Sequence, residues 1–350
     1  MSSILKNANK KGDSENQKRM KAIQFIAYGD ISENVITSEI EKPTINKNEV
    51  LIEAHAAGVN PLDYKVIEGA LKRVRKFKLP ATLGYDISGK IVAIGENVTR
   101  FKIGDEVYSR VKEQGTFTEF VAVDQQHIAL KPKNLTFIEA ASIPLAGLTA
   151  IQALKQAKIK TGDEVLIHAG SGGVGSFGIQ YAKAQGAFVY TTTSTENIKW
   201  VQELGADRVI DYKTEDYKLI AKEVDIVFET RGNQYTEDAF KVIKKGGKVI
   251  SLVGPVDKET ADRMRLNAIA KLFLAWKRRK ITKLIKLTSA HYSFLFMRPN
   301  AKQLKEITDL VETGKIKTNI DKVFSLEDTL DALLYVKKGR TKGKVVIKIK

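Results

Sequence analysis

One glycine-rich turn limits the possible folds of this chain more than any other feature. Residues 165–176 read VLIHAGSGGVGS, so a G-x-G-x-x-G pattern follows a short apolar run and opens a helix-like segment. Such glycines let the backbone turn tightly and approach a diphosphate at the positive end of the helix. The alternative is a glycine-rich turn without a ligand. The residues that we expect to hold a dinucleotide are Ala169, Gly170, Gly172, Gly173, Val174 and Gly175.

The segments around this turn alternate between strand and helix patterns. Helices are predicted at 173–184 and 196–204, with Gly186 and Gly205 at their carboxyl ends. Such alternation implies right-handed crossovers and a doubly wound parallel sheet, so the predicted fold class is α/β. The predicted strands are 165–168, 188–193, 208–212, 226–230 and 248–253, and 293–297 is a candidate for a sixth.

Two further regions have other patterns. Before residue 144, alternating apolar and polar runs such as 50–56 and 87–94 are separated by turn residues, which predicts a β-rich domain with close turns. After residue 297, we expect a helix at 301–313, closed by Gly314, and a final strand at 344–350. The remaining strands predicted in the β-rich region are 101–108 and a strand pair at 115–123.

Composition limits the class of protein. The chain has 350 residues, 43% of them hydrophobic and 28% charged, which is typical of a globular protein with a substantial core. It has no cysteine, which excludes disulfides and thiolate-bound zinc. Residues 1–19 are polar and predict a disordered tail. The net charge of +17 indicates either an anionic partner or merely a well-solvated surface.

The end of the second predicted strand indicates which dinucleotide binds. NAD enzymes place an acidic residue about 20 residues after the turn, to bind the ribose 2′-hydroxyl. This chain has no acid between residues 176 and 195, and the position holds hydroxyls, including Thr193 and Ser194. Because a carboxylate would repel a 2′-phosphate, we expect NADPH. Lys199 and Tyr212 are candidate phosphate ligands, although Lys199 could equally be a solvated helix charge.

Several segments, taken in order, resemble the quinone oxidoreductase branch of the medium-chain dehydrogenase/reductase superfamily, including its enone and alkenal oxidoreductases. They are 57–63 (AGVNPLD), 84–107, 141–154 (ASIPLAGLTAIQAL), the glycine turn and 204–212 (LGADRVIDY). The resemblance spans residues 21–350 and implies a Rossmann domain inserted into a β-rich, GroES-like catalytic domain. The expected domains are the tail at 1–19, the GroES-like domain at 20–143 and 298–350, and the Rossmann domain at 144–297.

The resemblance also implies site residues. Asn60 would lie beside the nicotinamide and the substrate carbonyl. Lys65 would stabilise the developing oxyanion or supply a proton, with Tyr64 and Tyr85 as alternatives. Lys65 could instead be a surface charge or a ribose contact, with the proton coming from water. Asn60 and Tyr85 stand where zinc-dependent relatives carry Cys and His, so no metal is expected. The remaining cofactor contacts implied are Thr149, Val253, Gly254 and Lys344.

Together these features predict NADPH-dependent reduction of activated C=C bonds or quinones by hydride transfer without zinc. The alternative is a membrane-docked, NADPH-binding redox sensor with little turnover. We expect a cytoplasmic location, and relatives of this kind are often homodimers.

Residues 263–286 form a basic excursion with nine Lys or Arg, no acid, and apolar residues at helical spacing. This pattern suggests contact with a membrane surface, which would make the protein peripheral to a membrane. The alternative is an amphipathic helix pair that packs over the substrate cleft. Nucleic acid is a disfavoured partner, because no nucleic-acid-binding motif accompanies the charge.

Overall fold

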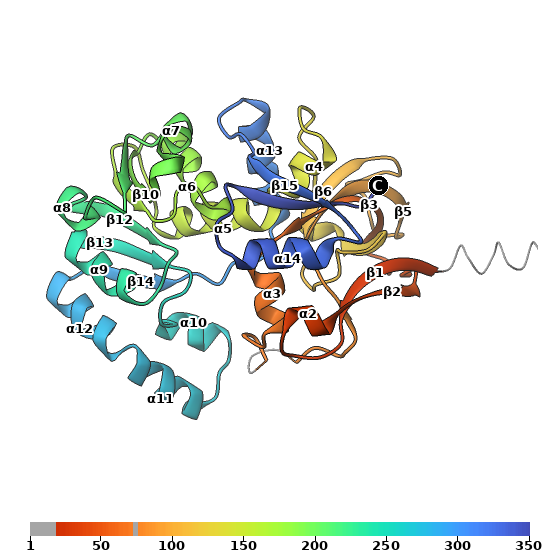
Figure 1. Cartoon of the computed structure of the whole chain (residues 1–350), viewed down its shortest axis with the longest axis horizontal. Helices are drawn as coiled ribbons and strands as arrows, with labels where there is room; N and C mark the ends of the chain where they lie inside the picture. Colours follow the sequence, from red (N-terminus) through yellow and green to blue (C-terminus); the bar gives the residue numbers. More distant parts are fainter. Residues whose placement is uncertain (1–18, 73–75) are drawn as a thin grey trace, which may run out of the picture. The chain divides into compact units, whose positions relative to one another are not determined.

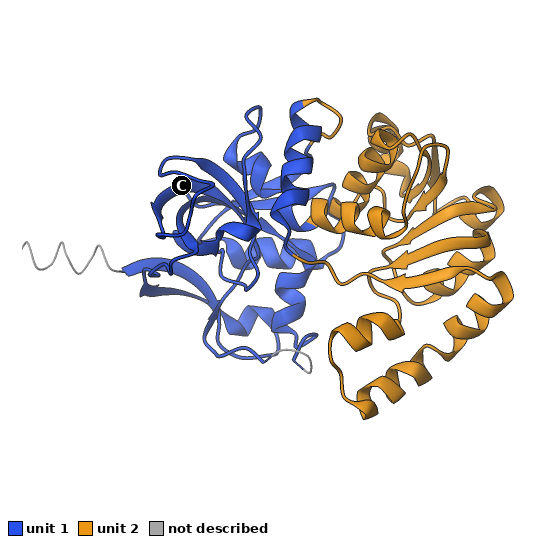
Figure 2. Ribbon diagram, turned by 180° about the vertical axis from the view of Figure 1, so that it is seen from behind, with its two compact units in different colours: residues 1–145, 299–312, 318–350 blue, residues 146–298, 313–317 orange. Residues whose placement is uncertain are grey.

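The computed structural model describes residues 19–72 and 76–350, which divide into two compact units (Figures 1 and 2). Strand β1 (Arg19–Phe25) begins one residue before the expected start at Met20. The rest of the predicted tail lies outside the described residues. Unit 1 contains the chain up to Leu145 together with Pro299–Glu312 and Thr318–Lys350, and unit 2 contains Ala146–Arg298 and Thr313–Lys317.

Unit 2 contains a six-stranded parallel sheet with the order β11-β10-β9-β12-β13-β14, which confirms the doubly wound fold. The sixth strand was expected at 293–297. Instead β14 begins at His291, because residues 291–294 pair with the end of β13. The strands are β9 (Glu164–Ile167), β10 (Phe188–Thr193), β11 (Arg208–Asp211), β12 (Val224–Glu229), β13 (Ile243–Ser251) and β14 (His291–Phe294).

Helices connect these strands, as the alternating pattern predicted. Gly186 and Gly205 adopt φ values of +80° and +98° just after α6 and α7, which explains why glycine ends both helices. Within the described residues, no helix combines the length and the apolar character that a bilayer crossing requires. The helices are α5 (Pro144–Gln156), α6 (Gly173–Ala184), η2 (Thr195–Asn197), α7 (Ile198–Glu203), α8 (Tyr217–Ile220), α9 (Gln234–Val242), α10 (Lys258–Arg263), α11 (Ala268–Lys277) and α12 (Arg279–Thr288).

Unit 1 contains a seven-stranded sheet, β15-β16-β3-β5-β6-β8 with β7 beside β3, and a three-stranded sheet, β2-β1-β4. The strand pair expected at 115–123 is one strand, β7, preceded by an isolated bridge at Thr118. Besides β1, the strands are β2 (Val35–Glu41), β3 (Glu49–Val59), β4 (Ala81–Thr82), β5 (Asp86–Ile94), β6 (Glu106–Arg110), β7 (Phe120–Asp124), β8 (Ile128–Leu130), β15 (Ile320–Ser325) and β16 (Lys344–Lys348). The helices are α2 (Ile31–Asn34), α3 (Pro61–Ile67), η1 (Gln125–His127), α4 (Phe137–Ala141), α13 (Ala301–Glu312) and α14 (Thr329–Lys337).

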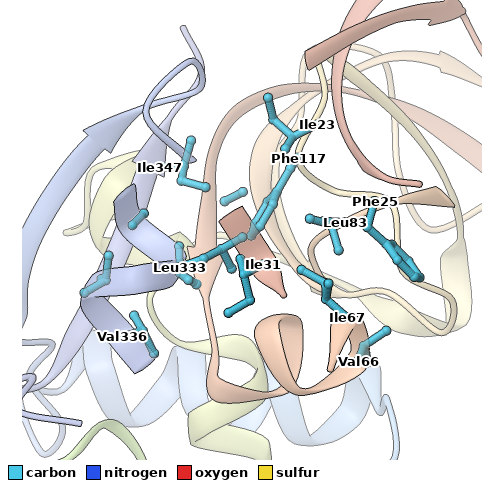
Figure 3. Close-up of a cluster of buried hydrophobic side chains, with 14 of the residues drawn as sticks. Ile23, Phe25, Ile31, Val66, Ile67, Leu83, Phe117, Leu333, Val336 and Ile347 are labelled. Carbon is cyan, nitrogen blue, oxygen red and sulfur yellow. The ribbon is translucent and has the colours of Figure 1, made fainter. Parts of the chain in front are cut away.

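The main core of unit 1 joins the two ends of the chain (Figure 3). Phe25 on β1 and Ile67 on α3 lie in one buried cluster with Leu333 on α14 and Ile347 on β16. Removing this apolar surface from water is the main stabilising contribution available to the unit. Residues 318–350 are therefore part of the folded body of unit 1.

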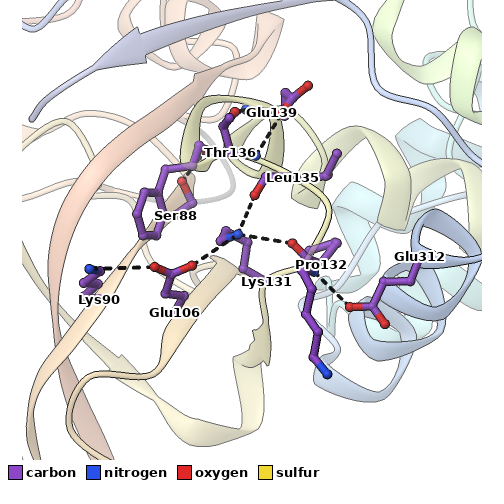
Figure 4. A network of polar contacts seen from close by, with 11 residues as sticks. Ser88, Lys90, Glu106, Lys131, Pro132, Leu135, Thr136, Glu139 and Glu312 are labelled. Carbon is purple, nitrogen blue, oxygen red and sulfur yellow. Dashed lines mark hydrogen bonds and ion pairs between the residues drawn. The ribbon is translucent and has the colours of Figure 1, made fainter.

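A second set of contacts in unit 1 is polar (Figure 4). The buried Lys131 ammonium donates to the carbonyl of Leu135 and lies 3.3 Å from Glu106 Oε2. The backbone N–H of Lys133 donates to Glu312 at the end of α13, at 2.9 Å. These bonds attach α13 to the loop that follows β8.

Candidate functional site

The glycine turn of unit 2 is built for close packing. It follows β9, and Ala169 adopts a φ of +56°, a value that is uncommon for a residue with a side chain. A Cβ at Gly170 would lie 2.3 Å from Thr191 Oγ1, and one at Gly175 would lie 2.2 Å from the Ala169 carbonyl oxygen. Both glycines are therefore required by the protein's own packing.

Gly172 differs from these two glycines. A Cβ there would come no closer than 3.4 Å, an ordinary contact with the Ala169 oxygen. Gly172 is also the N-cap of α6, and it has no side chain to bond the first N–H groups of the helix. The amides of Gly173 and Val174 begin the helix at half-buried positions. The turn thus offers helix amides and an open approach, which fits a diphosphate.

Buried hydroxyls lie at the carboxyl end of the neighbouring strand β10. Thr193 is buried, and its Oγ1 has no hydrogen-bond partner among the described residues. Ser194 is also buried, while Lys199 on α7 is exposed. The Tyr212 N–H donates to the Thr193 carbonyl at 3.1 Å, which brings the exposed Tyr212 ring to this strand end. The structure therefore brings Thr193, Ser194 and Tyr212 together.

Two carboxylates that the sequence analysis did not consider also lie in this region. Asp211 accepts a hydrogen bond from Thr195 Oγ1 at 2.5 Å, which holds the pKa of this carboxyl below its ordinary value. Glu196 lies 2.9 Å from Lys213 Nζ, and the bond from this lysine lowers the pKa of Glu196 to about 2. Each carboxylate already has its own partner, and Lys213 adds a cation to this edge.

A pocket of about 460 Å³ lies beside Tyr212. The rings of Tyr217 and Tyr235 stack at 6.0 Å, and His168 meets both rings edge-on. Burial lowers the pKa of His168 to about 3, so its imidazole is neutral. These aromatic surfaces suit a flat, uncharged ring system. The pocket is lined by Tyr212, Lys213, Thr214, Glu215, Asp216, Tyr217, Lys218, Gln234, Tyr235 and Asp238.

The buried carboxylate of Glu229 organises the carboxyl ends of β12 and β13. One of its oxygens accepts two backbone N–H groups of the following turn, each at 2.5 Å. The other accepts the hydroxyls of Thr236 at 2.9 Å and Ser251 at 2.6 Å. Ser251 Oγ in turn accepts the Gly254 N–H at 2.8 Å. Glu229, which the sequence analysis missed, thereby fixes the backbone around Val253 and Gly254.

In unit 1, five polar residues form what we call the buried polar cluster: Asn60, Asp63, Asp86, Arg110 and Lys344. Asn60 ends β3 and caps α3, where Pro61 occupies the first helical position. Asp86 begins β5, and Lys344 begins β16. Because β16 pairs with β3 in antiparallel register, with Val345 opposite Val59, Lys344 reaches Asn60.

The hydrogen bonds of this cluster occupy the whole Asn60 amide. Its Oδ1 accepts Lys344 Nζ at 2.5 Å, and its Nδ2 donates to Asp86 Oδ2 at 2.9 Å and to the Gly58 carbonyl at 3.3 Å. Its backbone N–H donates to Asp63 Oδ2 at 2.7 Å. Both amide N–H bonds are used inside the cluster, so Asn60 is held in one orientation.

Burial dominates the electrostatics of the cluster. It raises the pKa of Asp63 to about 7 and that of Asp86 to about 6, and the Lys344 charge opposes both shifts. Burial also lowers the pKa of Lys344, whose Nζ lies 3.8 Å from Asp86 Oδ2. Arg110 lies 4.8 Å over the Tyr85 ring and lowers both acidic pKa values further. The cluster therefore contains two carboxyls whose pKa values burial raises toward neutrality.

Of the other predicted catalytic residues, only Tyr85 touches the cluster, through the Arg110 guanidinium over its ring. Lys65 is exposed on α3, and it follows Asp63 by two residues, which points the two side chains to opposite helix faces. Tyr64 is half-buried and packs against the main core of unit 1. Tyr85 is buried, with its hydroxyl 3.4 Å from Gln114 Oε1. Thr149 is buried in α5.

A zinc site does not fit the residues present. Among the described residues, no group of three or more His, Cys, Asp or Glu side chains could hold a metal ion, and the chain contains no cysteine. Asn60 and Tyr85 occupy the positions where zinc ligands were considered. The Asn60 amide bonds to Lys344, Asp86 and Gly58.

Comparisons with known proteins give consistent results. A family described as "Alcohol dehydrogenase GroES-like domain" matches residues 46–133, and one described as "Zinc-binding dehydrogenase" matches 204–347. The 2-methylene-furan-3-one reductase of Solanum lycopersicum is 35% identical over 94% of this chain and 79% of its own length. The chloroplastic NADPH-dependent alkenal/one oxidoreductase of Arabidopsis thaliana is 35% identical, over 96% and 81%. The structure of the quinone oxidoreductase from Coxiella burnetii matches 95% of this chain and 100% of its own, with a TM-score of 0.82 and 34% identity.

Proposed function

Because the chain belongs to the medium-chain dehydrogenase/reductase superfamily, in its quinone and enone oxidoreductase branch, we propose that it uses NADPH to reduce activated C=C bonds or quinones. The observation that carries this proposal is the turn at Gly172. Packing within the protein does not require glycine at this position. Glycine is required if a diphosphate approaches the first amides of α6.

We propose that the same unit distinguishes NADPH from NADH at the end of β10. The Thr193 hydroxyl is buried without a partner, and a phosphate oxygen would satisfy it. Ser194, Lys199 and Tyr212 complete a site with hydroxyls and a cation. The aromatic surfaces of Tyr217 and Tyr235 support a place for the adenine ring in the neighbouring pocket.

When bound, the nicotinamide supplies a hydride to the electrophilic carbon of the substrate. The chain must then stabilise negative charge on the substrate oxygen and provide a proton. Asn60 has no amide N–H left to donate, so we assign it a positioning role at the end of β3. We propose that the exposed Lys65 stabilises the oxyanion or donates the proton, with Tyr64 and Tyr85 as alternatives.

We propose that this reaction needs no zinc, since the chain lacks cysteine and the residues around Asn60 bond to each other. The test is NADPH consumption against a panel of 2-alkenals, enones, benzoquinones and simple alcohols, with product analysis. We expect turnover with the first three classes and no loss of rate after dialysis against a chelator. A strict requirement for added zinc would overturn the proposal.

The role of Lys65 has its own test. Lys65→Met should lower kcat about 100-fold, the usual range for loss of a positioned acid, while NADPH affinity stays unchanged. Lys65→Arg should restore part of the rate if charge is what matters. Lys47→Met, which removes an exposed cation elsewhere in unit 1, is the matched control. If Lys65→Met keeps the wild-type kcat, the proton comes from water and Lys65 has no role in its delivery.

A second candidate function is a membrane-docked, NADPH-binding redox sensor with little turnover. The observation that favours it is helix α11, on which no residue is buried. The sensor hypothesis predicts tight NADPH binding and no product with the whole substrate panel. Product formation at ordinary enzymatic rates would contradict it.

A further inference from the structure

The three helices α10, α11 and α12 leave the sheet of unit 2 after β13 and return to it at β14 (Figure 1). Helix α12 is attached to the body of this unit. Its Ile281 is buried in the same apolar cluster as residues of α9 and β13, and Leu284 and Ile285 pack against that cluster. This part of the basic excursion therefore packs on unit 2 against α9 and β13.

Helix α11 is different, because its apolar side chains face solvent. They recur at intervals of three and four residues, which places them on one face of the helix. The Phe273 and Trp276 rings stack at 6.1 Å, so the aromatic pair forms a continuous ridge. The exposed fractions of the four residues, which we call the α11 ridge, are 81% for Ile269, 74% for Leu272, 48% for Phe273 and 58% for Trp276.

Cations lie directly on this ridge. Lys277 Nζ is 5.0 Å from the centroid of the Phe273 ring, and the Arg279 guanidinium is 4.8 Å from that of Trp276. Residues 263–286 contain nine Lys or Arg and no acid; of these, Lys271 is paired with Asp262 at 2.7 Å and Lys280 with Glu237 at 3.2 Å. An apolar ridge rimmed by positive charge complements a surface that is apolar inside and anionic at its boundary.

We propose that the α11 ridge inserts into the surface of an anionic lipid bilayer. A helix of 10 residues is about 15 Å long, so it can lie in the interface with its apolar face among the acyl chains. Trp and Phe favour this boundary, and Lys277 and Arg279 can reach lipid phosphates. This inference is independent of the proposed reductase activity, and it would bring the protein to membrane-dissolved apolar substrates.

Charge argues for lipid over a second copy of the chain. A homodimer formed through this face would bring Lys277 and Arg279 of both copies together, and residues 263–286 contain no acid to offset them. The ridge is a single helix face, and a bilayer surface can cover it without a complementary groove. Acidic polymers would also complement the positive charge, but they have no apolar surface to cover the four apolar side chains.

The test is vesicle co-sedimentation of the full-length protein. We expect association with vesicles of phosphatidylcholine and phosphatidylglycerol and much weaker association with phosphatidylcholine alone. The double variant Leu272→Ser/Trp276→Ser should lower the partition coefficient about tenfold or more, since two large apolar side chains no longer enter the bilayer. The control Leu219→Ser removes an apolar side chain that is 70% exposed on α8 and should leave association unchanged.

Fluorescence gives a second readout. The chain has two tryptophans, so Trp200→Phe leaves Trp276 as the sole reporter, and its emission should shift to the blue on anionic vesicles. NADPH binding measured on each variant verifies that unit 2 is folded. Equal association of Leu272→Ser/Trp276→Ser, or association with DNA but not with vesicles, would overturn the proposal. So would a wild-type dimer that this double variant converts to monomer, because the ridge would then be an interface between copies.

Discussion

Replacing Lys344 with methionine tests the electrostatics of the buried polar cluster. The substitution keeps an unbranched apolar stem but removes an ammonium that donates to Asn60 Oδ1 and to the Val59 carbonyl, and that lies 3.8 Å from Asp86. Two buried acceptors lose their donor, and two buried carboxyls lose their nearest cation.

The size of the effect depends on pH. At about pH 8, where Asp63 and Asp86 are ionised, removing one partner from a buried ion pair costs about 3–5 kcal/mol of unfolding free energy. At about pH 5 both carboxyls are protonated in the folded state, and the remaining loss is about 2 kcal/mol for the two unsatisfied acceptors. The folded pKa of each carboxyl is raised above its unfolded value, so the native state holds more protons and stability falls as pH rises.

The assay is urea unfolding of wild type and Lys344→Met across this pH range. Lys348→Met, on the exposed end of the same strand, is the matched control and should lose little at either pH. In a double variant, Asp86→Asn should lessen the loss at high pH, because only one of the two buried carboxylates then carries a charge that lacks compensation. A loss from Lys344→Met that is equal at both pH values would refute the electrostatic reasoning and leave packing alone as the explanation.

Three further predictions concern other residues. Gly175→Ala should weaken NADPH binding at least about tenfold in a fluorescence titration, since the added Cβ would lie 2.2 Å from the Ala169 oxygen. The control Gly178→Ala adds a Cβ whose contacts are 3.5 Å or more, and this variant should bind NADPH normally. Glu229→Leu should cost about 3 kcal/mol in urea unfolding because it leaves four buried donors without an acceptor; a loss under about 1 kcal/mol would contradict this. Asp63→Asn should flatten the decline in thermal stability that the wild type shows as pH rises from about 4 to about 7, and an unchanged slope would mean that Asp63 titrates normally.

The fold of unit 2 could be predicted because its signals are local. Gly186 and Gly205 end helices at positive φ, and apolar runs mark the buried parallel strands. Unit 1 was harder to read. Strands β1, β2 and β15, and helix α14, were not predicted. Part of what holds unit 1 together is distant in sequence: β16 pairs with β3, and one apolar cluster joins residues of β1 to residues of α14. Periodicity carries no information about such distant partners.

The candidate site likewise has one part that could be predicted from the sequence and one part that could not. The turn around Gly172 is visible in the sequence because one short segment contains both the glycines and the helix start. The buried polar cluster is not, because Asn60, Asp86 and Lys344 are contributed by three strands. Asp86 lies inside the segment 84–107 that carries the family resemblance. Its carboxylate within an apolar run is the signal that could have identified it as a site residue. Lys344 was expected to contact the cofactor, and the partners that the structure gives it, Asn60 and Val59, were not predicted.

The position of Lys344 and Ile347 near the end of the chain has a consequence for biosynthesis. Unit 2 is encoded almost entirely before residue 299, so it can fold while synthesis continues. Unit 1 cannot close its core or compensate its buried carboxylates until the final strand leaves the ribosome. The nascent chain therefore carries an unfinished N-terminal half until residues 344–348 have been synthesised, and truncation before Lys344 would leave that half without β16.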